Sequence, residues 1–111
     1  MEPRLRSGIW IQALIRRCDG AAVSAYVLRK GDADSGAILL KLNRRAAGCT
    51  VLAQARGEAG ELVWLRGTGS EPVDEAAADA YIARQAGRDP DLWVLEIDAA
   101  AGEALLDGKI L

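Results

Sequence analysis

The sequence predicts one two-layer α+β domain, with an antiparallel sheet of about five strands and two helices packed on one face of the sheet. Two segments repeat apolar residues with the period of a helix, and four short apolar runs lie between them, followed by a fifth. No linker, repeat or low-complexity segment divides the 111 residues, of which 50% are apolar. We therefore expect a single domain over residues 1–111, in the order α-β-β-β-β-α-β.

The first helix is predicted over residues 7–19, with Ser7 as the N-cap and Gly20 closing the other end. At 100° per residue its apolar side chains cover well over half of the circumference, which is more than one contact with a sheet needs. We expect a second helix or another subunit to cover the remainder.

The second helix is predicted over residues 73–86, with Asp74 and Glu75 in its first turn and Gly87 at its end. Apolar runs bounded by turn residues predict the strands, and the tail "EALLDGKIL" adds a short edge strand. The five main strands are expected at residues 22–30, 37–43, 49–56, 62–66 and 92–98.

Two short connections that contain glycine predict hairpins. In the first, "GDADSG" joins residues 22–30 to residues 37–43, so that Val27 pairs with Leu40 and Tyr26 lies opposite Lys41. In the second, "GEAGE" joins residues 49–56 to residues 62–66.

The chain contains no histidine, which excludes a Ser-His-Asp or Cys-His relay within one subunit. Cys18 and Cys49 lack any metal-binding or redox spacing and are interpreted as small buried residues. We predict no catalytic residue, metal ligand or cofactor. Enzymatic activity is left open, and the residues favour a protein without it.

The loop "GDADSG" places Asp32 and Asp34 at the spacing that begins a calcium loop. The required final glutamate is absent, because the apolar run 37–42 follows at once. Aspartate and glycine also suit a tight strand connection, which is the interpretation we prefer. A carboxylate-based metal-dependent enzyme remains as an alternative.

The segment "ARQAGRDPDLWVLEI" gathers charged and aromatic residues across a helix end, a turn and a strand. Strand alternation predicts that Trp93, Leu95 and Ile97 point to one face while Val94 and Glu96 point to the other. A structural ion pair is the simpler interpretation of such a glutamate beside arginines. The candidate interaction or functional cluster is Arg84, Arg88, Asp89, Asp91, Trp93 and Glu96.

Charge is distributed unevenly along the chain, with a net +6 in residues 1–56 and −8 in residues 57–111. We expect the halves to pack together and neutralise each other. The alternative is a nucleic-acid-associated protein whose basic surface comprises Arg16–Arg17, Arg29–Lys30 and Arg44–Arg45, with Tyr26.

Self-association is a further prediction. Trp10 and Arg17 lie about 20° apart on the first helix and are residue types favoured at interfaces. We expect a homodimer in which this helix or an exposed sheet edge forms the contact.

Three segments resemble bacterial domain-of-unknown-function family 1491, an uncharacterised family. They are "GIWIQALIRR", "VLRKGDADSGAILLKLNR" and "VDEAAADAYIARQAGRDPDLWVLEID". The last is the most specific, with a helix ending in arginine, then Asp-Pro-Asp-Leu-Trp and a strand with Glu96. The alanine-rich stretch after Asp98 departs from the pattern. The resemblance implies a single domain and brings no activity with it.

The sequence thus predicts a non-catalytic protein-interaction or structural module in the cytoplasm. Its expected partner is another protein or a second copy of itself. No run approaches the roughly 18 apolar residues of a membrane span, so no membrane partner is expected.

Overall fold

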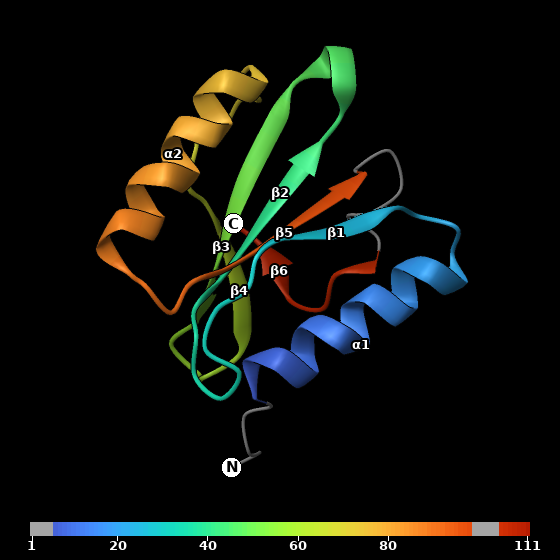
Figure 1. Cartoon of the computed structure of the whole chain (residues 1–111), viewed down its shortest axis with the longest axis vertical. Helices are drawn as coiled ribbons and strands as arrows, with labels where there is room; N and C mark the ends of the chain where they lie inside the picture. Colours follow the sequence, from blue (N-terminus) through green and yellow to red (C-terminus); the bar gives the residue numbers. More distant parts are fainter. Residues whose placement is uncertain (1–5, 99–104) are drawn as a thin grey trace.

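A computed structural model, which describes residues 6–98 and 105–111, shows two helices on a six-stranded mixed sheet (Figure 1). A short 3₁₀ helix, Arg45–Ala47, joins two of the strands. The main elements are α1 (Ser7–Gly20), β1 (Ala25–Arg29), β2 (Ile38–Asn43), β3 (Cys49–Arg56), β4 (Leu62–Arg66), α2 (Glu75–Arg88), β5 (Trp93–Asp98) and β6 (Lys109–Ile110).

The sheet has the strand order β1-β5-β2-β3-β4-β6. Strands β2, β3 and β4 form an antiparallel meander, which confirms the predicted hairpin around "GEAGE". β5 is parallel to β2 and antiparallel to β1, and β6 is parallel to β4. The α+β class is confirmed, but the expectation of a purely antiparallel sheet of about five strands is wrong.

The predicted hairpin between the first two strands is also wrong, because β5 lies between β1 and β2. Most of the β5 side chains are buried, on both faces of the sheet, and such a strand needs an interior position. The loop between β1 and β2 therefore crosses two strand spacings, about 10 Å. Tyr26 and Lys41 do not face each other, since both are registered against Glu96 on the intervening strand.

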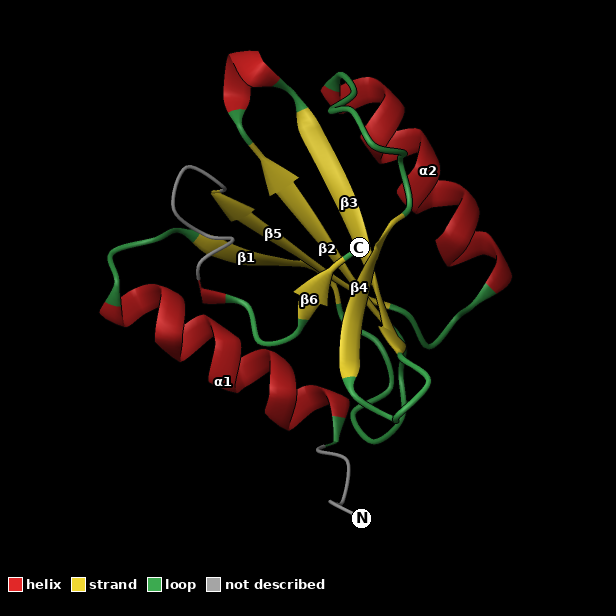
Figure 2. Ribbon diagram, turned by 180° about the vertical axis from the view of Figure 1, so that it is seen from behind, coloured by secondary structure: helices red, strands yellow, loops and turns green. Residues whose placement is uncertain are grey.

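The helices pack on opposite faces of the sheet (Figure 2), so the expected two-layer arrangement is corrected to three layers. Both faces of the central strands are apolar, and each face needs a cover. On the α1 face the buried cluster includes Leu14, Leu40 and Trp64. On the α2 face it includes Ala78, Leu39 and Val94.

The wide apolar surface of α1 is covered by the C-terminal segment as well as by the sheet. Leu105, Leu106 and Ile110 pack against the same buried cluster as the helix. Trp10 lies against Trp64 of β4, with ring centroids 5.5 Å apart. This cover comes from the end of the chain rather than from the second helix.

Two details of the helix ends bear on the loops beside them. Ser7 is not the N-cap of α1: that position is Arg6, and the Ser7 hydroxyl donates instead to the carbonyl of Gly36 at 2.5 Å. Asp74 caps α2, where its side chain accepts from the N–H of Ala77.

No helix in residues 6–98 and 105–111 is long and apolar enough to cross a membrane. The alanine-rich departure after Asp98 lies mostly outside the described residues.

Candidate functional site

The "GDADSG" loop is held together by the side chain of Asp32. Its carboxylate Oδ2 accepts from the backbone N–H of Ser35 at 2.9 Å, the Ser35 hydroxyl at 3.1 Å and the N–H of Asp34 at 3.1 Å. These hydrogen bonds, led by those from Ser35, lower the pKa of Asp32 below its usual value. The carboxylate faces its own loop, as in an Asx turn.

The same loop is fastened to the start of β5. The Asp32 N–H donates to the carbonyl of Asp91 at 3.0 Å, and the Trp93 indole donates to the carbonyl of Asp32 at 2.7 Å. A Cβ on Gly31 or Gly36 would stand 2.1 or 2.2 Å from the Asp91 carbonyl oxygen. The glycines are therefore needed for close packing of backbone on backbone.

A cluster of four charged side chains lies under α2, around Lys41. This lysine projects from the centre of β2 towards the helix, and its side chain is only 3% exposed. Its Nζ lies 2.7 Å from Glu75 Oε2, 2.8 Å from Asp79 Oδ1 and 3.2 Å from Glu96 Oε1. Glu75 and Asp79 are one helical turn apart on α2, while Glu96 is the neighbour of Lys41 on β5.

These ion pairs join the basic first half of the chain to its acidic second half. Arg17 and Asp107 form another such pair at 3.0 Å. Their geometry agrees with the expected neutralisation of one half by the other.

Burial opposes the charge on Lys41, but the hydrogen bonds that its ammonium group donates to Asp79, Glu75 and Glu96 outweigh it, and the pKa of Lys41 is raised. A lysine held protonated in this way is not a nucleophile or a general base at neutral pH. Burial also raises the pKa of the Cys18 and Cys49 thiols, which disfavours their reactive thiolate forms.

Within the described ranges, no group of three or more His, Cys, Asp or Glu side chains is placed to hold a metal ion. The three carboxylates around Lys41 already converge on an ammonium group.

The six residues of the sequence-derived cluster are divided between the two faces of the sheet. Trp93 is buried on the α1 face and Glu96 points to the α2 face, as strand alternation predicted. Asp89 accepts from the N–H of Asp91 in the turn between α2 and β5. Glu96 pairs with Lys41 of β2, and no ion pair joins it to either Arg84 or Arg88 within the described residues.

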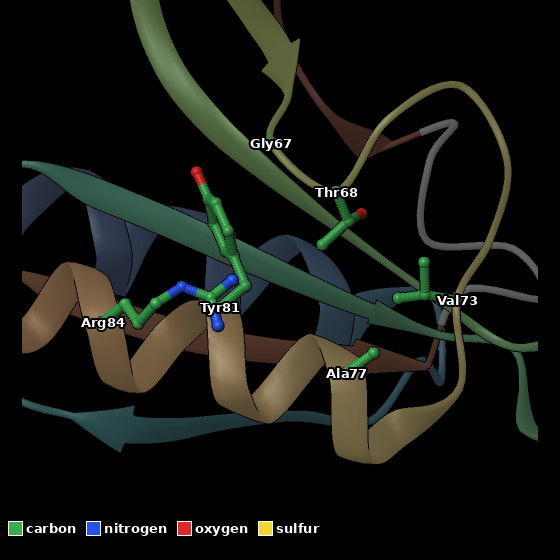
Figure 3. A pocket seen from close by; sticks show the side chains of 6 residues that line it. All are labelled: Gly67, Thr68, Val73, Ala77, Tyr81 and Arg84. Atoms are coloured by element: carbon green, nitrogen blue, oxygen red, sulfur yellow. The ribbon is translucent and has the colours of Figure 1, made fainter.

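Arg84 borders a pocket of about 260 Å³ between α2 and the loop that follows β4 (Figure 3). Its side chain extends along the helix towards Tyr81, and Thr68 lies on the opposite wall. A Cβ on Gly67 would stand 2.3 Å from the Tyr81 hydroxyl oxygen, so the absence of a side chain at position 67 makes room for that hydroxyl. The pocket is lined by Gly67, Thr68, Val73, Ala77, Tyr81 and Arg84.

The outer edge of β1 has no strand beside it among the described residues. Three consecutive side chains of this strand are exposed: Tyr26 by 55%, Val27 by 43% and Leu28 by 50%. The only other large apolar side chains that are exposed in the described ranges are Ile9, Leu65 and Leu111, which are not consecutive. β1 therefore carries an unusual apolar edge.

Alternate backbone groups of β1 point towards this outer edge. The N–H of Asp98 donates to the carbonyl of Ser24 at 3.0 Å, which sets the alternation of the antiparallel ladder. By that alternation the N–H and C=O groups of Ala25 and Val27 point away from β5. A bulge follows, between Val27 and Arg29.

The three basic pairs do not gather on one surface. Arg44–Arg45 lie in the β2–β3 turn, at the opposite end of the sheet from Arg29–Lys30, which follow β1 (Figure 1). Arg16–Arg17 lie on α1, where Arg17 is already paired with Asp107. This distribution gives no continuous basic track for a phosphate backbone.

The chain matches one known protein family over nearly its whole length. A family model described as "Protein of unknown function (DUF1491)" matches residues 5–107. The chain belongs to this family. The resemblance found in the sequence is thereby confirmed.

Among solved structures, a DUF1491 family protein from Caulobacter crescentus CB15 is 37% identical. Its crystal structure gives a TM-score of 0.84 and covers 97% of this chain and 100% of its own. The NMR structure of a DUF1491 family protein from that organism gives 0.82 at 37% identity, with 99% of each chain covered. Protein Atu0922 from A. tumefaciens is 26% identical, with a TM-score of 0.75 and coverage of 94% and 93%. No curated protein matches the chain.

Two features of this DUF1491 protein were not predicted from its sequence. Lys41 was placed on a strand but not connected to its carboxylates, because two of them belong to a helix whose face was not known. The apolar edge was assigned to the interior of a hairpin. The run "AYVLR" could have indicated an edge strand, since the loop that follows it is too long for a tight hairpin turn.

Proposed function

We propose that this protein is a non-catalytic interaction module that self-associates by pairing its β1 strand with β1 of a second copy. The observation that carries the proposal is the run of exposed apolar side chains at Tyr26–Leu28, on a strand whose outer edge pairs with no other strand of the described residues. Proteins ordinarily protect such edges with charge, proline or a covering element. Addition of a strand satisfies both the free backbone groups and the apolar side chains.

Charge favours a second copy in an antiparallel arrangement. Arg29 and Lys30 lie at the end of β1. Antiparallel pairing keeps these basic residues of one copy apart from those of the other, whereas parallel pairing brings the like charges together. A twofold pair is also the commonest closed assembly.

The non-catalytic part of the proposal rests on chemistry. The chain has no histidine, the pKa of Lys41 is raised, and the thiols are buried. Each of these removes a common nucleophile or general base.

The strand is only five residues long, so the interface is small and the dimer is expected to be weak, with a dissociation constant of about 10–500 µM. Sedimentation equilibrium over a wide concentration range tests this. The Tyr26→Lys/Leu28→Lys double variant should remain monomeric, because it places two charges on the edge. Leu65→Lys is the matched control, since Leu65 is a comparably exposed residue of β4.

A wild-type mass that stays near 11.8 kDa at every concentration contradicts self-association. If the double variant dimerises as strongly as the wild type, the dimer contact does not lie on β1. The alternative contact is then α1 with Trp10 and Arg17, the surface predicted from the sequence.

A further inference from the structure

The pocket beside α2 lies at a division of charge on the helix. By helical periodicity, Glu75 and Asp79 lie on one side of α2, where both contact Lys41. Tyr81, Arg84 and Arg88 lie towards the other side, where Tyr81 and Arg84 line the pocket. The helix thus presents its acids to the sheet and its arginines to the pocket side.

Three hydrogen-bond donors border this pocket. In the described residues, neither the Arg84 guanidinium nor the Tyr81 hydroxyl has a hydrogen-bond or ion-pair partner. Thr68 Oγ1 accepts from the N–H of Val51 at 3.2 Å, which leaves its hydroxyl hydrogen free to donate. Donors of this kind, one of them cationic, favour a carboxylate.

The remaining lining is apolar. Val73 and Ala77 contribute only carbon side chains to it. Leu65, paired with Ala53 on the same face of the sheet, is exposed two residues before Gly67. A volume of about 260 Å³ is enough for one amino-acid-sized group.

We propose that this pocket binds a carboxylate carried on a short aliphatic group, with Arg84, Tyr81 and Thr68 as the donors. The neighbouring carboxylates of the chain do not occupy these donors. The Asp74 carboxylate accepts from the N–H of Ala77 at 2.8 Å, and the Asp79 carboxylate is paired with Lys41. Glu71 stands exposed in the adjoining loop and opposes the anion from a distance. The site lies beyond β3 from the β1 edge and does not depend on the dimer.

The probe for this site is N-acetyl-L-leucine, titrated into ¹⁵N-labelled protein at neutral pH and low salt. We expect saturable shifts of the amide signals of Gly67, Thr68 and Ala77, with a dissociation constant of about 1–10 mM for so small a ligand. N-acetyl-L-leucinamide has the same shape without the charge, and it should bind at least about tenfold more weakly.

Arg84→Gln should weaken binding of N-acetyl-L-leucine about tenfold or more, and Tyr81→Phe by a smaller factor of about threefold. Arg16→Gln removes an exposed arginine from the other helix and should change nothing. Glu71→Gln should strengthen binding slightly. Well-dispersed spectra of each variant show that it is folded.

The carboxylate has two sources, a free acid or the end of a peptide chain. Isovalerate represents the first, and a tetrapeptide with a free C-terminal leucine represents the second. If either ligand binds the wild type and fails to bind Arg84→Gln, the site is supported. The ligand that binds more tightly then shows whether the carboxylate belongs to a free acid or to a peptide end. Equal binding of the acid and its amide, an unaffected Arg84→Gln variant, or shifts that map elsewhere would each overturn the proposal.

Discussion

Lys41 and Glu96 are registered neighbours on the parallel strands β2 and β5, and the Lys41 ammonium lies 3.2 Å from Glu96 Oε1. Of the three carboxylates around Lys41, Glu96 is the most buried, with 19% of its side chain exposed. The other two belong to α2 and are more than half exposed. The Lys41–Glu96 pair therefore links β2 to β5 within the sheet, and α2 covers the pair.

Replacement of Lys41 by methionine is expected to lower the free energy of unfolding by about 1–3 kcal/mol. The variant leaves three carboxylates close together, with Glu96 mostly out of water. The loss is smaller than that of breaking a fully buried ion pair, because the helix carboxylates remain hydrated. Urea denaturation measures the change, and Lys109→Met provides an exposed lysine as control.

The double variant Lys41→Met/Glu96→Gln should recover part of this loss, because the buried negative charge is then removed. If Lys41→Met is as stable as the Lys109 control, the carboxylates do not depend on the lysine and the interpretation is wrong.

The Lys41 contribution should persist to alkaline pH. Its pKa is raised in the folded protein, so its contribution to stability is complete below the pKa of an unfolded lysine, about 10.4. It is lost only as the pH rises through the higher folded value. The stability difference between wild type and Lys41→Met should be constant from pH 7 to about 10 and shrink above that. A difference that disappears below pH 9 would contradict the assignment.

Asp32 should act in the opposite direction. Its pKa is lowered in the folded protein, so its contribution is present above the unfolded aspartate pKa of about 3.9 and is lost as the pH falls through the folded value. Asp32→Asn should therefore be less stable than wild type at pH 6, with the difference narrowing below pH 4. Asp34→Asn is the control. A rise in melting temperature with added Ca²⁺ would instead revive the loop as a cation site.

Gly36→Ala is expected to cost about 1–3 kcal/mol, the usual range for an overpacked site. The new Cβ would stand 2.2 Å from the Asp91 carbonyl oxygen and 2.8 Å from Trp93 Cδ1, and the first of these belongs to backbone that cannot move alone. Gly20→Ala is the same chemical change at the end of α1, where a Cβ meets nothing within 4 Å. It should be neutral or slightly stabilising. Thermal unfolding compares the two, and equal effects would show that the loop can shift.

Trp10→Ala separates a core role from an interface role. Because Trp10 packs against Trp64 within one chain, the substitution should lower stability by about 1–3 kcal/mol at concentrations where only monomer exists. A loss that appears only at high protein concentration would instead place Trp10 between subunits.

The elements themselves were largely predictable from the sequence, because each depends on local periodicity. The bounds of β3 and β4 match the predicted runs, and the alternation that separates Trp93 from Glu96 is confirmed. Strand order was not predictable in the same way. Nothing local to residues 22–43 indicates that a strand from residues 93–98 enters between them.

For the candidate sites too, features that depend on local sequence could be predicted, and features that depend on the tertiary fold could not. The acidic loop does turn locally around Asp32, whose side chain bonds within its own loop, but the tight hairpin connection predicted there is wrong because β5 lies between β1 and β2. The pocket beside α2 depends on a helix residue, Arg84, meeting a loop residue, Thr68, and that contact requires the tertiary fold. Arg84 could be selected from the sequence, but its place beside Tyr81 and Thr68 could not.

The insertion of β5 between β1 and β2 also has a consequence for the order in which the chain folds as it leaves the ribosome. The meander of β2, β3 and β4 uses only contacts close in sequence and can assemble early. β1 is synthesised before that meander, yet it has no strand partner until residues 93–98 have emerged. The edge of β1 that will pair with β5, and the edge of β2 that will pair with β5, must both remain unpaired through most of synthesis, which makes the nascent chain the state most exposed to aggregation.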